Sequence, residues 1–175
     1  MKLATCLSSV LIAMLSSCLS IHRAEAYSVE FKRIYFPPGR PLQSESSADI
    51  DKVLDQEQMH VLLGLLQALK GDPIVGAEVM GFADKNECLP RACRQLSLRR
   101  AKIVFDWLLD NGVPVEQLRG PSGESIDWPL DSGETEDGRA INRRVQLEPY
   151  SLRRDDSKGR GNIQPTGLLH QTSVR

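Results

Sequence analysis

Hydrophobic and polar positions follow two different periods along the chain, and these periods predict strands and helices in turn. Apolar residues alternate with polar ones over 28–36 and again over 74–82, as expected of strands with one buried face. Between these two segments, apolar residues recur at three- and four-residue steps from Ile50 to Leu69, which is the period of an amphipathic helix. The first half of the chain therefore predicts a strand, a long helix and a second strand.

The second half predicts another long helix and two further strands. We expect a polar loop over 84–95, a helix over 96–110, a strand over 118–124, an exposed loop over 128–138, a short helix over 136–142 and a last strand over 144–149. The order strand, helix, strand, helix, strand, strand predicts an α+β fold. In this βαβαββ sandwich, two long helices pack on one face of a small mixed sheet.

The first 26 residues have the pattern of an export signal rather than of a folded domain. Lys2 precedes an uncharged run over 3–21, and Ala24-Glu25-Ala26 provides a small-x-small cleavage site. A retained membrane anchor is one alternative. In another, Leu15-Ser16-Ser17-Cys18 resembles a bacterial lipobox, and Cys18 would carry a lipid that tethers the domain to a membrane. We therefore expect a signal peptide over 1–26, one domain over 27–150 and a disordered tail over 151–175.

Composition and cysteine usage narrow the possible functions. The chain of 175 residues has 22 basic and 23 acidic residues, and this balance argues against a general nucleic-acid binder. Cys88 and Cys93 lie close together, as expected for a disulfide in an oxidising compartment. Two of the four cysteines, Cys6 and Cys18, lie in the predicted leader. The other two thiols and three scattered histidines do not complete a zinc site, so we expect neither a metal nor a cofactor.

Two oppositely charged residues stand where a strand and the next helix should meet. Asp84 follows the strand over 74–82, and Arg100 falls near the start of the predicted helix, on its buried side. Together they suit a zwitterionic ligand, with Asp84 receiving an ammonium and Arg100 forking onto a carboxylate. They could equally pair with each other, and their spacing does not decide between these interpretations.

Four motifs in order give a more specific indication. These are Gly81-Phe82-Ala83-Asp84, Leu96-Ser97-Leu98-Arg99-Arg100-Ala101, Gly123-Glu124-Ser125 with Pro129, and Gly138-Arg139-Ala140-Ile141-Asn142-Arg143-Arg144-Val145. Together they resemble the OmpA-like C-terminal domain of bacterial outer-membrane proteins, peptidoglycan-associated lipoproteins and flagellar stator proteins. The resemblance implies non-covalent binding of peptidoglycan through the diaminopimelate of its stem peptide. It assigns the ligand contacts to Asp84 and Arg100, supporting roles to Asn142 and Arg143, and a structural role to Arg144.

The sequence departs from the family pattern around the predicted site. Ala83 replaces the usual threonine, Cys93 stands where asparagine is common, and the loop between Asp84 and Arg100 is one residue longer. These changes favour, as an alternative, an interaction module of the same fold whose peptidoglycan binding is weakened or lost. In either case we expect an exported, non-enzymatic protein of the periplasm or outer membrane. It would be held there by the cell wall, by a lipid anchor or by a partner protein.

Overall fold

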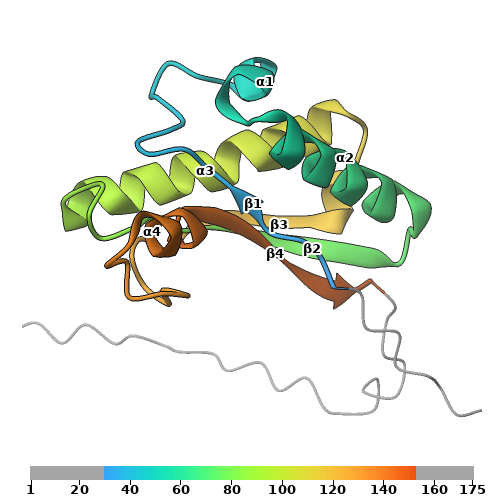
Figure 1. Ribbon diagram of the computed structural model, residues 1–175. Coiled ribbons are helices and arrows are strands. Elements are labelled where there is room, and N and C mark those ends of the chain that lie inside the picture. The colour runs from blue at the N-terminus through green and yellow to red at the C-terminus, as the bar shows by residue number, and fades with distance from the viewer. Residues whose placement is uncertain (1–29, 153–175) are drawn as a thin grey trace, which may run out of the picture.

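The computed structural model describes residues 30–152, which form one four-stranded sheet covered on one face by helices (Figure 1). Its strands are β1 (Ile34–Tyr35), β2 (Val75–Gly81), β3 (Leu118–Gly123) and β4 (Arg144–Ser151). Its helices are α1 (Ile50–Val53), α2 (Gln56–Gly71), α3 (Pro90–Asp110) and α4 (Glu136–Asn142), with 3-10 turns at Ser47–Asp49 and Val115–Gln117. The predicted α+β sandwich, with two long helices on one face of a mixed sheet, is confirmed. The predicted signal peptide and Cys18 lie outside the described residues, as does the tail beyond 152.

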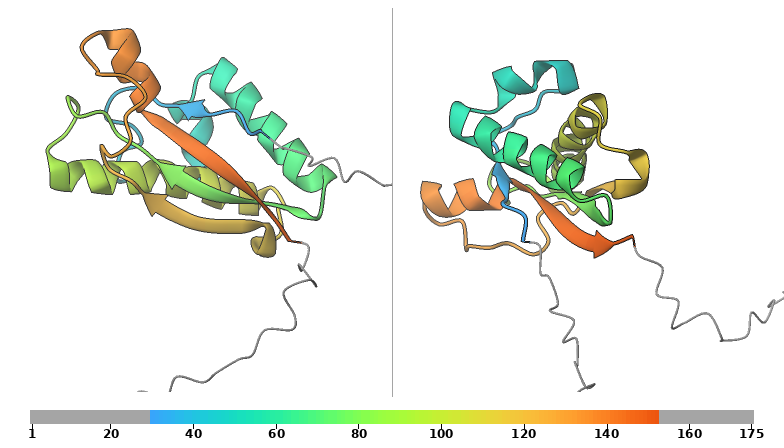
Figure 2. Two further views of the ribbon diagram at one scale, coloured as in Figure 1. Left: turned by 90° about the horizontal axis from the view of Figure 1, so that it is seen from below. Right: turned by 90° about the vertical axis from the view of Figure 1, so that its right-hand side faces the viewer.

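The sheet has the order β1-β4-β2-β3 and is mixed in direction. β2 and β4 are antiparallel with an unbroken register from Val75↔Ser151 to Gly81↔Val145, whereas β2 and β3 are parallel. Because parallel neighbours need a crossover connection, α3 runs between β2 and β3 across one face of the sheet. Figure 2 shows that α4 and the loop after β2 lie at the same end of the sheet.

One core joins the helices to the sheet. Alternate residues of β2 and β4, among them Val79 and Val145, face the helices and are buried. Leu62, Leu65 and Leu69 of α2 recur at the helical period and complete the core with residues of α3. Burial of this apolar face stabilises both helices more than their intrinsic propensity does. Within residues 30–152, no helix combines the length and apolar character needed to cross a bilayer.

Glycine sets how closely α3 approaches the sheet. A Cβ atom at Gly81 would lie 2.0 Å from the carbonyl oxygen of Ser97, and one at Gly123 would lie 2.7 Å from the amide nitrogen of Leu98. Neither position could hold a side chain without moving backbone. The contact fixes the middle of α3 beside the end of β2, where Arg100 and Asp84 are found.

The predicted boundaries differ most from the structure at three elements. The single helix over Ile50–Leu69 is divided into α1 and α2, because the Asp55 side chain caps α2 by accepting from the amide of Gln58. The first strand is reduced to Ile34–Tyr35 in place of 28–36. The helix predicted from residue 96 begins at Pro90, whose missing N–H costs nothing in a first helical turn.

The domain also extends slightly beyond its predicted end at residue 150. Ser151 is the last residue of β4, and the amide of Leu152 donates to the carbonyl of Ile74 at 2.8 Å. These two residues therefore belong to the folded domain, not to the tail that we predicted from residue 151.

Candidate functional site

Asp84 lies just past the end of β2 and is 1% exposed. Its Oδ1 accepts from the amide of Asn86, and its Oδ2 accepts from Nδ2 of Asn142, both at 2.9 Å. The loop before α4 covers the carboxylate closely, since a Cβ atom at Gly133 would lie 2.8 Å from Oδ2. Gly133 also has φ +74, a conformation that favours glycine. Asp84 is therefore a buried, hydrogen-bonded acid just past the end of an inner strand.

Asn142, the last residue of α4, joins this loop to Asp84. Its Oδ1 accepts from the amides of Leu130 and Asp131 at 2.9 and 3.1 Å. Its Nδ2 donates to the carbonyl of Asp131 at 3.0 Å as well as to Asp84. The side chain is 3% exposed and fully engaged, so it holds the loop over the acid.

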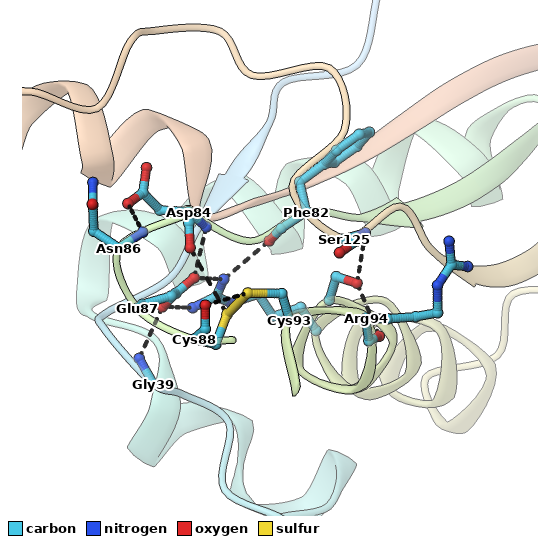
Figure 3. The surroundings of a disulfide bond; sticks show 11 residues. Gly39, Phe82, Asp84, Asn86, Glu87, Cys88, Cys93, Arg94 and Ser125 are labelled. Atoms are coloured by element: carbon cyan, nitrogen blue, oxygen red, sulfur yellow. Dashed lines mark hydrogen bonds and ion pairs between the residues drawn. A yellow bond between two sulfur atoms is a disulfide. The ribbon is translucent and has the colours of Figure 1, made fainter. Parts of the chain in front are cut away.

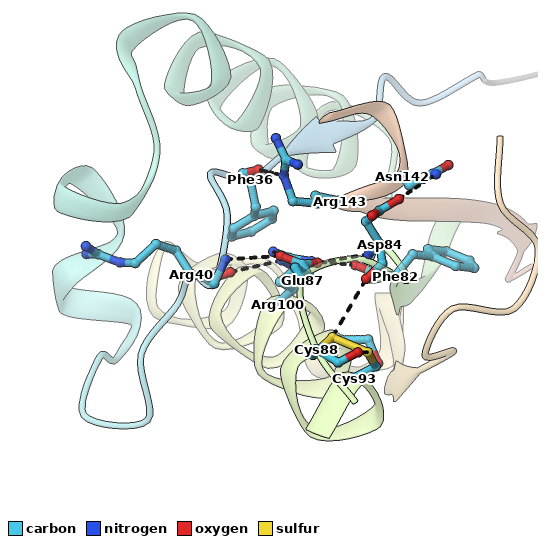
Figure 4. Close-up of polar contacts among 12 residues, drawn as sticks. Phe36, Arg40, Phe82, Asp84, Glu87, Cys88, Cys93, Arg100, Asn142 and Arg143 are labelled. Atoms are coloured by element: carbon cyan, nitrogen blue, oxygen red, sulfur yellow. Dashed lines mark hydrogen bonds and ion pairs between the residues drawn. A yellow bond between two sulfur atoms is a disulfide. The ribbon is translucent and has the colours of Figure 1, made fainter. Parts of the chain in front are cut away.

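Arg100 lies in the middle of α3 and has no exposed surface. Its guanidinium forks onto Glu87, with Nη1 2.6 Å from Oε1 and Nη2 2.8 Å from Oε2 (Figure 4). The remaining donors reach backbone carbonyls: Nε reaches Arg40 at 2.9 Å, Nη1 reaches Phe82 at 3.0 Å and Nη2 reaches Pro37 at 3.4 Å. All five N–H groups of the guanidinium are thus used.

Glu87 accepts hydrogen bonds from both sides of the site. Besides Arg100, Oε1 accepts from the amide of Asp84 at 2.9 Å, and Oε2 accepts from the amide of Gly39 at 3.0 Å. Desolvation by burial acts to raise the pKa of Glu87, but Arg100 and the two amides outweigh it and hold that pKa below its ordinary value. Burial lowers the pKa of Arg100 although Glu87 opposes this. A guanidinium stays protonated in proteins, so the pair is ionic.

Asp84 and Arg100 do not pair directly with each other, whereas their joint role in holding a ligand stays a prediction. The two residues lie at the same end of the sheet, but each is bonded to another side chain, and Glu87 joins them by accepting from both. Glu87 was missed by the sequence reasoning. The available signal was an acid three residues after Asp84 in the same loop, because a buried arginine requires a partner. The expectation that Arg100 lies in the first turns of the helix was also wrong, since α3 begins at Pro90, ten residues before it.

Arg143 and Arg144, at the end of the fourth motif, contact different parts of the domain. Nε of Arg143 donates to the carbonyl of Phe36 at 3.1 Å and Nη2 donates to Glu136 at 2.7 Å, which fixes the segment after β1 (Figure 4). Arg144 lies with its guanidinium 3.8 Å from the centre of the Phe82 ring and donates to the carbonyl of Trp128. Burial, with a smaller effect from Arg33, lowers the pKa of Arg144 to about 10.

The predicted disulfide between Cys88 and Cys93 is confirmed. Its two Cα atoms are 5.2 Å apart, and it ties the residue after Glu87 to the first turns of α3 (Figure 3). Closing so short a ring lowers the conformational entropy of the unfolded chain, which stabilises the folded state by about 2 kcal/mol. The bridge therefore restrains the loop that carries Glu87. Over residues 30–152, no group of three or more metal-ligating side chains is placed to hold an ion.

Known proteins resemble this chain in sequence and in fold, although no family model matches it. Outer membrane lipoproteins named for the type IV secretion system in Brucella abortus and Brucella melitensis are 28% identical over 115 residues, which are 66% of this chain. The chain spans 58% of the length of these relatives.

Solved structures show the same fold. The peptidoglycan-associated lipoprotein of Burkholderia pseudomallei matches with a TM-score of 0.54 and 23% identity, covering 68% of this chain and 90% of that one. The C-terminal domain of Helicobacter pylori MotB matches with a TM-score of 0.52 and 24% identity, covering 70% and 90%. This chain therefore has the OmpA-like fold of a peptidoglycan-associated lipoprotein and of a MotB periplasmic domain.

Proposed function

We propose that this protein binds peptidoglycan non-covalently through the diaminopimelate of the stem peptide and so anchors the outer membrane or an envelope complex to the cell wall. One observation carries the proposal: Asp84, Arg100 and Asn142, from three separate elements, lie in one cluster at the end of β2. The fold is shared with a peptidoglycan-associated lipoprotein. The relatives named as outer membrane lipoproteins agree with the envelope location that the leader predicts.

The charges of the cluster match the two ends of such a ligand. The Asp84 carboxylate would receive the side-chain ammonium of diaminopimelate, and Arg100 would receive its carboxylate. Binding requires that the loop around Gly133 uncover Asp84 and that the ligand reach Arg100. Arg143 would support the site indirectly by holding Phe36, whose ring lies 5.6 Å from the Arg100 guanidinium.

Modest affinity is sufficient for this role. A charge-assisted hydrogen bond contributes about 1.5–3 kcal/mol, part of which offsets the opening of the site. The cell wall presents the stem peptide in many copies, so rebinding and multivalency retain a protein whose single contacts are weak.

Co-sedimentation with purified sacculi tests the proposal. We expect the exported protein to pellet with sacculi, and Asp84→Asn or Arg100→Lys to move it to the supernatant. Asp84→Asn keeps the size of the buried group and Arg100→Lys keeps its positive charge, and circular dichroism would confirm that both variants fold. The matched controls Asp137→Asn and Arg91→Lys change exposed residues of α4 and α3 and should pellet normally. Equal pelleting of all four variants would refute this site.

A second candidate function is an interaction module for another envelope protein. Glu87 already satisfies Arg100, and the 128–130 loop carries Trp128 and Leu130 with 77% and 45% of their surfaces exposed. Large exposed aromatic residues are common anchors of protein interfaces. If this function is the principal one, Trp128→Ala abolishes retention in the envelope while Asp84→Asn does not.

A further inference from the structure

Four hydrogen-bond donors converge on the Glu87 carboxylate from three separate segments. Nη1 and Nη2 of Arg100 approach from α3, and the amide of Asp84 approaches from the loop after β2 (Figure 4). The amide of Gly39 approaches from the loop after β1 (Figure 3). We call these four groups the carboxylate cradle. A carboxylate has about four acceptor sites, so the cradle satisfies one carboxylate completely.

The cradle has the chemistry of a general carboxylate site. A guanidinium that forks onto both oxygens, with backbone amides completing the shell, recognises the carboxylate group itself, whichever residue bears it. The side chains of Arg100 and Glu87 are 0% and 7% exposed, so the interaction is largely shielded from water. In this structure the bound carboxylate belongs to the protein.

We propose that Glu87 is an internal ligand of the cradle, and that it sets the affinity of this site by competing with the carboxylate of an external ligand. The identity of that ligand rests on the function proposed above, whereas the competition rests on the cradle alone. A ligand carboxylate enters only when Glu87 leaves, and it then inherits the same four donors. The protein therefore binds a free carboxylate more weakly than the cradle would if it were open.

The chain keeps this competitor close. Glu87 is three residues after Asp84. The next residue, Cys88, is held by its disulfide to Cys93 in α3. A group tethered by a short linker competes at an effective concentration of about millimolar or higher. If the open state is populated at about 1%, the apparent affinity for a carboxylate falls about 100-fold relative to an open cradle.

Substitution of Glu87 tests the competition with small probes. The full exported chain with Glu87→Ala or Glu87→Gln would be titrated with sodium acetate and with meso-diaminopimelate, and thermal unfolding and calorimetry would be recorded. Both variants should melt below the wild type without a probe, because Arg100 loses its partner. Added probe should raise their melting temperature, and their affinity for meso-diaminopimelate should exceed that of the wild type by about tenfold or more. Glu57→Ala, an exposed glutamate of α2, is the matched control and should match the wild type.

The results separate this inference from the proposed function. Tighter binding of acetate and meso-diaminopimelate by the Glu87 variants supports internal competition, even if sacculi do not retain the wild type and the peptidoglycan proposal fails. Equal affinity in the wild type and the folded Glu87→Gln protein overturns the competition, even if both proteins pellet with sacculi. Absence of probe binding by every variant also overturns it. Glu87→Gln keeps the side-chain shape and serves as the test if Glu87→Ala does not fold.

Discussion

Arg100 and Glu87 form a buried, two-pronged ion pair, with N–O distances of 2.6 and 2.8 Å, at the point where β2, α3 and the loop after β1 meet. The pair lies in the middle of the predicted ligand site. It therefore contributes both to the stability of the fold and to control of access to Arg100.

Loss of one partner of this pair should destabilise the domain far more than loss of an exposed pair. Glu87→Gln leaves a buried guanidinium without a counter-charge, and we expect the free energy of unfolding to fall by about 3 kcal/mol. Asp106→Asn, which breaks the exposed pair with Lys102 at 2.7 Å, should cost about 0.5 kcal/mol or less. Urea denaturation measures both values. Similar losses for the two variants would contradict the assignment of Glu87 as a buried partner.

The same pair predicts how stability depends on pH. The folded protein holds the pKa of Glu87 below its ordinary value of 4.5, so its stabilising effect is complete above about pH 4.5 and is lost as pH falls through the folded-state pKa. The difference in unfolding free energy between wild type and Glu87→Gln should therefore shrink as pH falls below 4.5. A difference that stays constant from pH 7 down to acid unfolding would argue against an ionised Glu87.

Two glycines should respond in opposite ways to the same substitution. Gly81→Ala places a Cβ atom 2.0 Å from the Ser97 carbonyl and should destabilise the domain by about 3 kcal/mol or more, because α3 must move away from β2. Gly64→Ala, on the exposed side of α2, meets nothing within 4 Å and should stabilise it by up to about 1 kcal/mol. Thermal melts of both variants check the helix-to-sheet contact without a change to any charged residue.

Asn142 should be required for order in the loop that covers Asp84. Asn142→Ala leaves Asp84 Oδ2 and the amides of Leu130 and Asp131 without a partner, and should cost about 2–3 kcal/mol. Faster hydrogen exchange at Leu130 and Asp131 should accompany the loss. Ile141→Ala, on the exposed side of the same helix, is the control. Unchanged exchange in the Asn142 variant would mean that other contacts hold this loop.

The sequence predicted the fold well because its signals are local. The period-two pattern of β2, the helical pattern of α2 and the Asn111-Gly112 stop after α3 each depend on neighbouring residues only. The ends of helices were predicted less accurately where a residue type occurs both in loops and at helix starts. Pro90 was interpreted as part of a loop and instead opens α3, and Asp55 divides one apolar run into two helices.

The site was predicted only in part, because its contacts are long-range. Asp84 and Asn142 are 58 residues apart in sequence, and Arg100 donates to the carbonyl of Arg40, 60 residues away. The motifs that resemble a known family indicated Asp84, Arg100 and Asn142, which the fold places in one cluster. Glu87 lies outside those motifs, and only the folded loop shows that it reaches Arg100.

Amide resonances of the carboxylate cradle provide the most direct test of the central claim, that an external carboxylate takes the place of Glu87. The wild-type protein, labelled with nitrogen-15, would be titrated with a stem peptide that contains diaminopimelate. The amides of Gly39 and Asp84 now donate to Glu87, so we predict that both signals shift together and follow one dissociation constant. Saturating shifts confined to other surfaces, such as the Trp128 loop, with both cradle amides unchanged, would contradict the account.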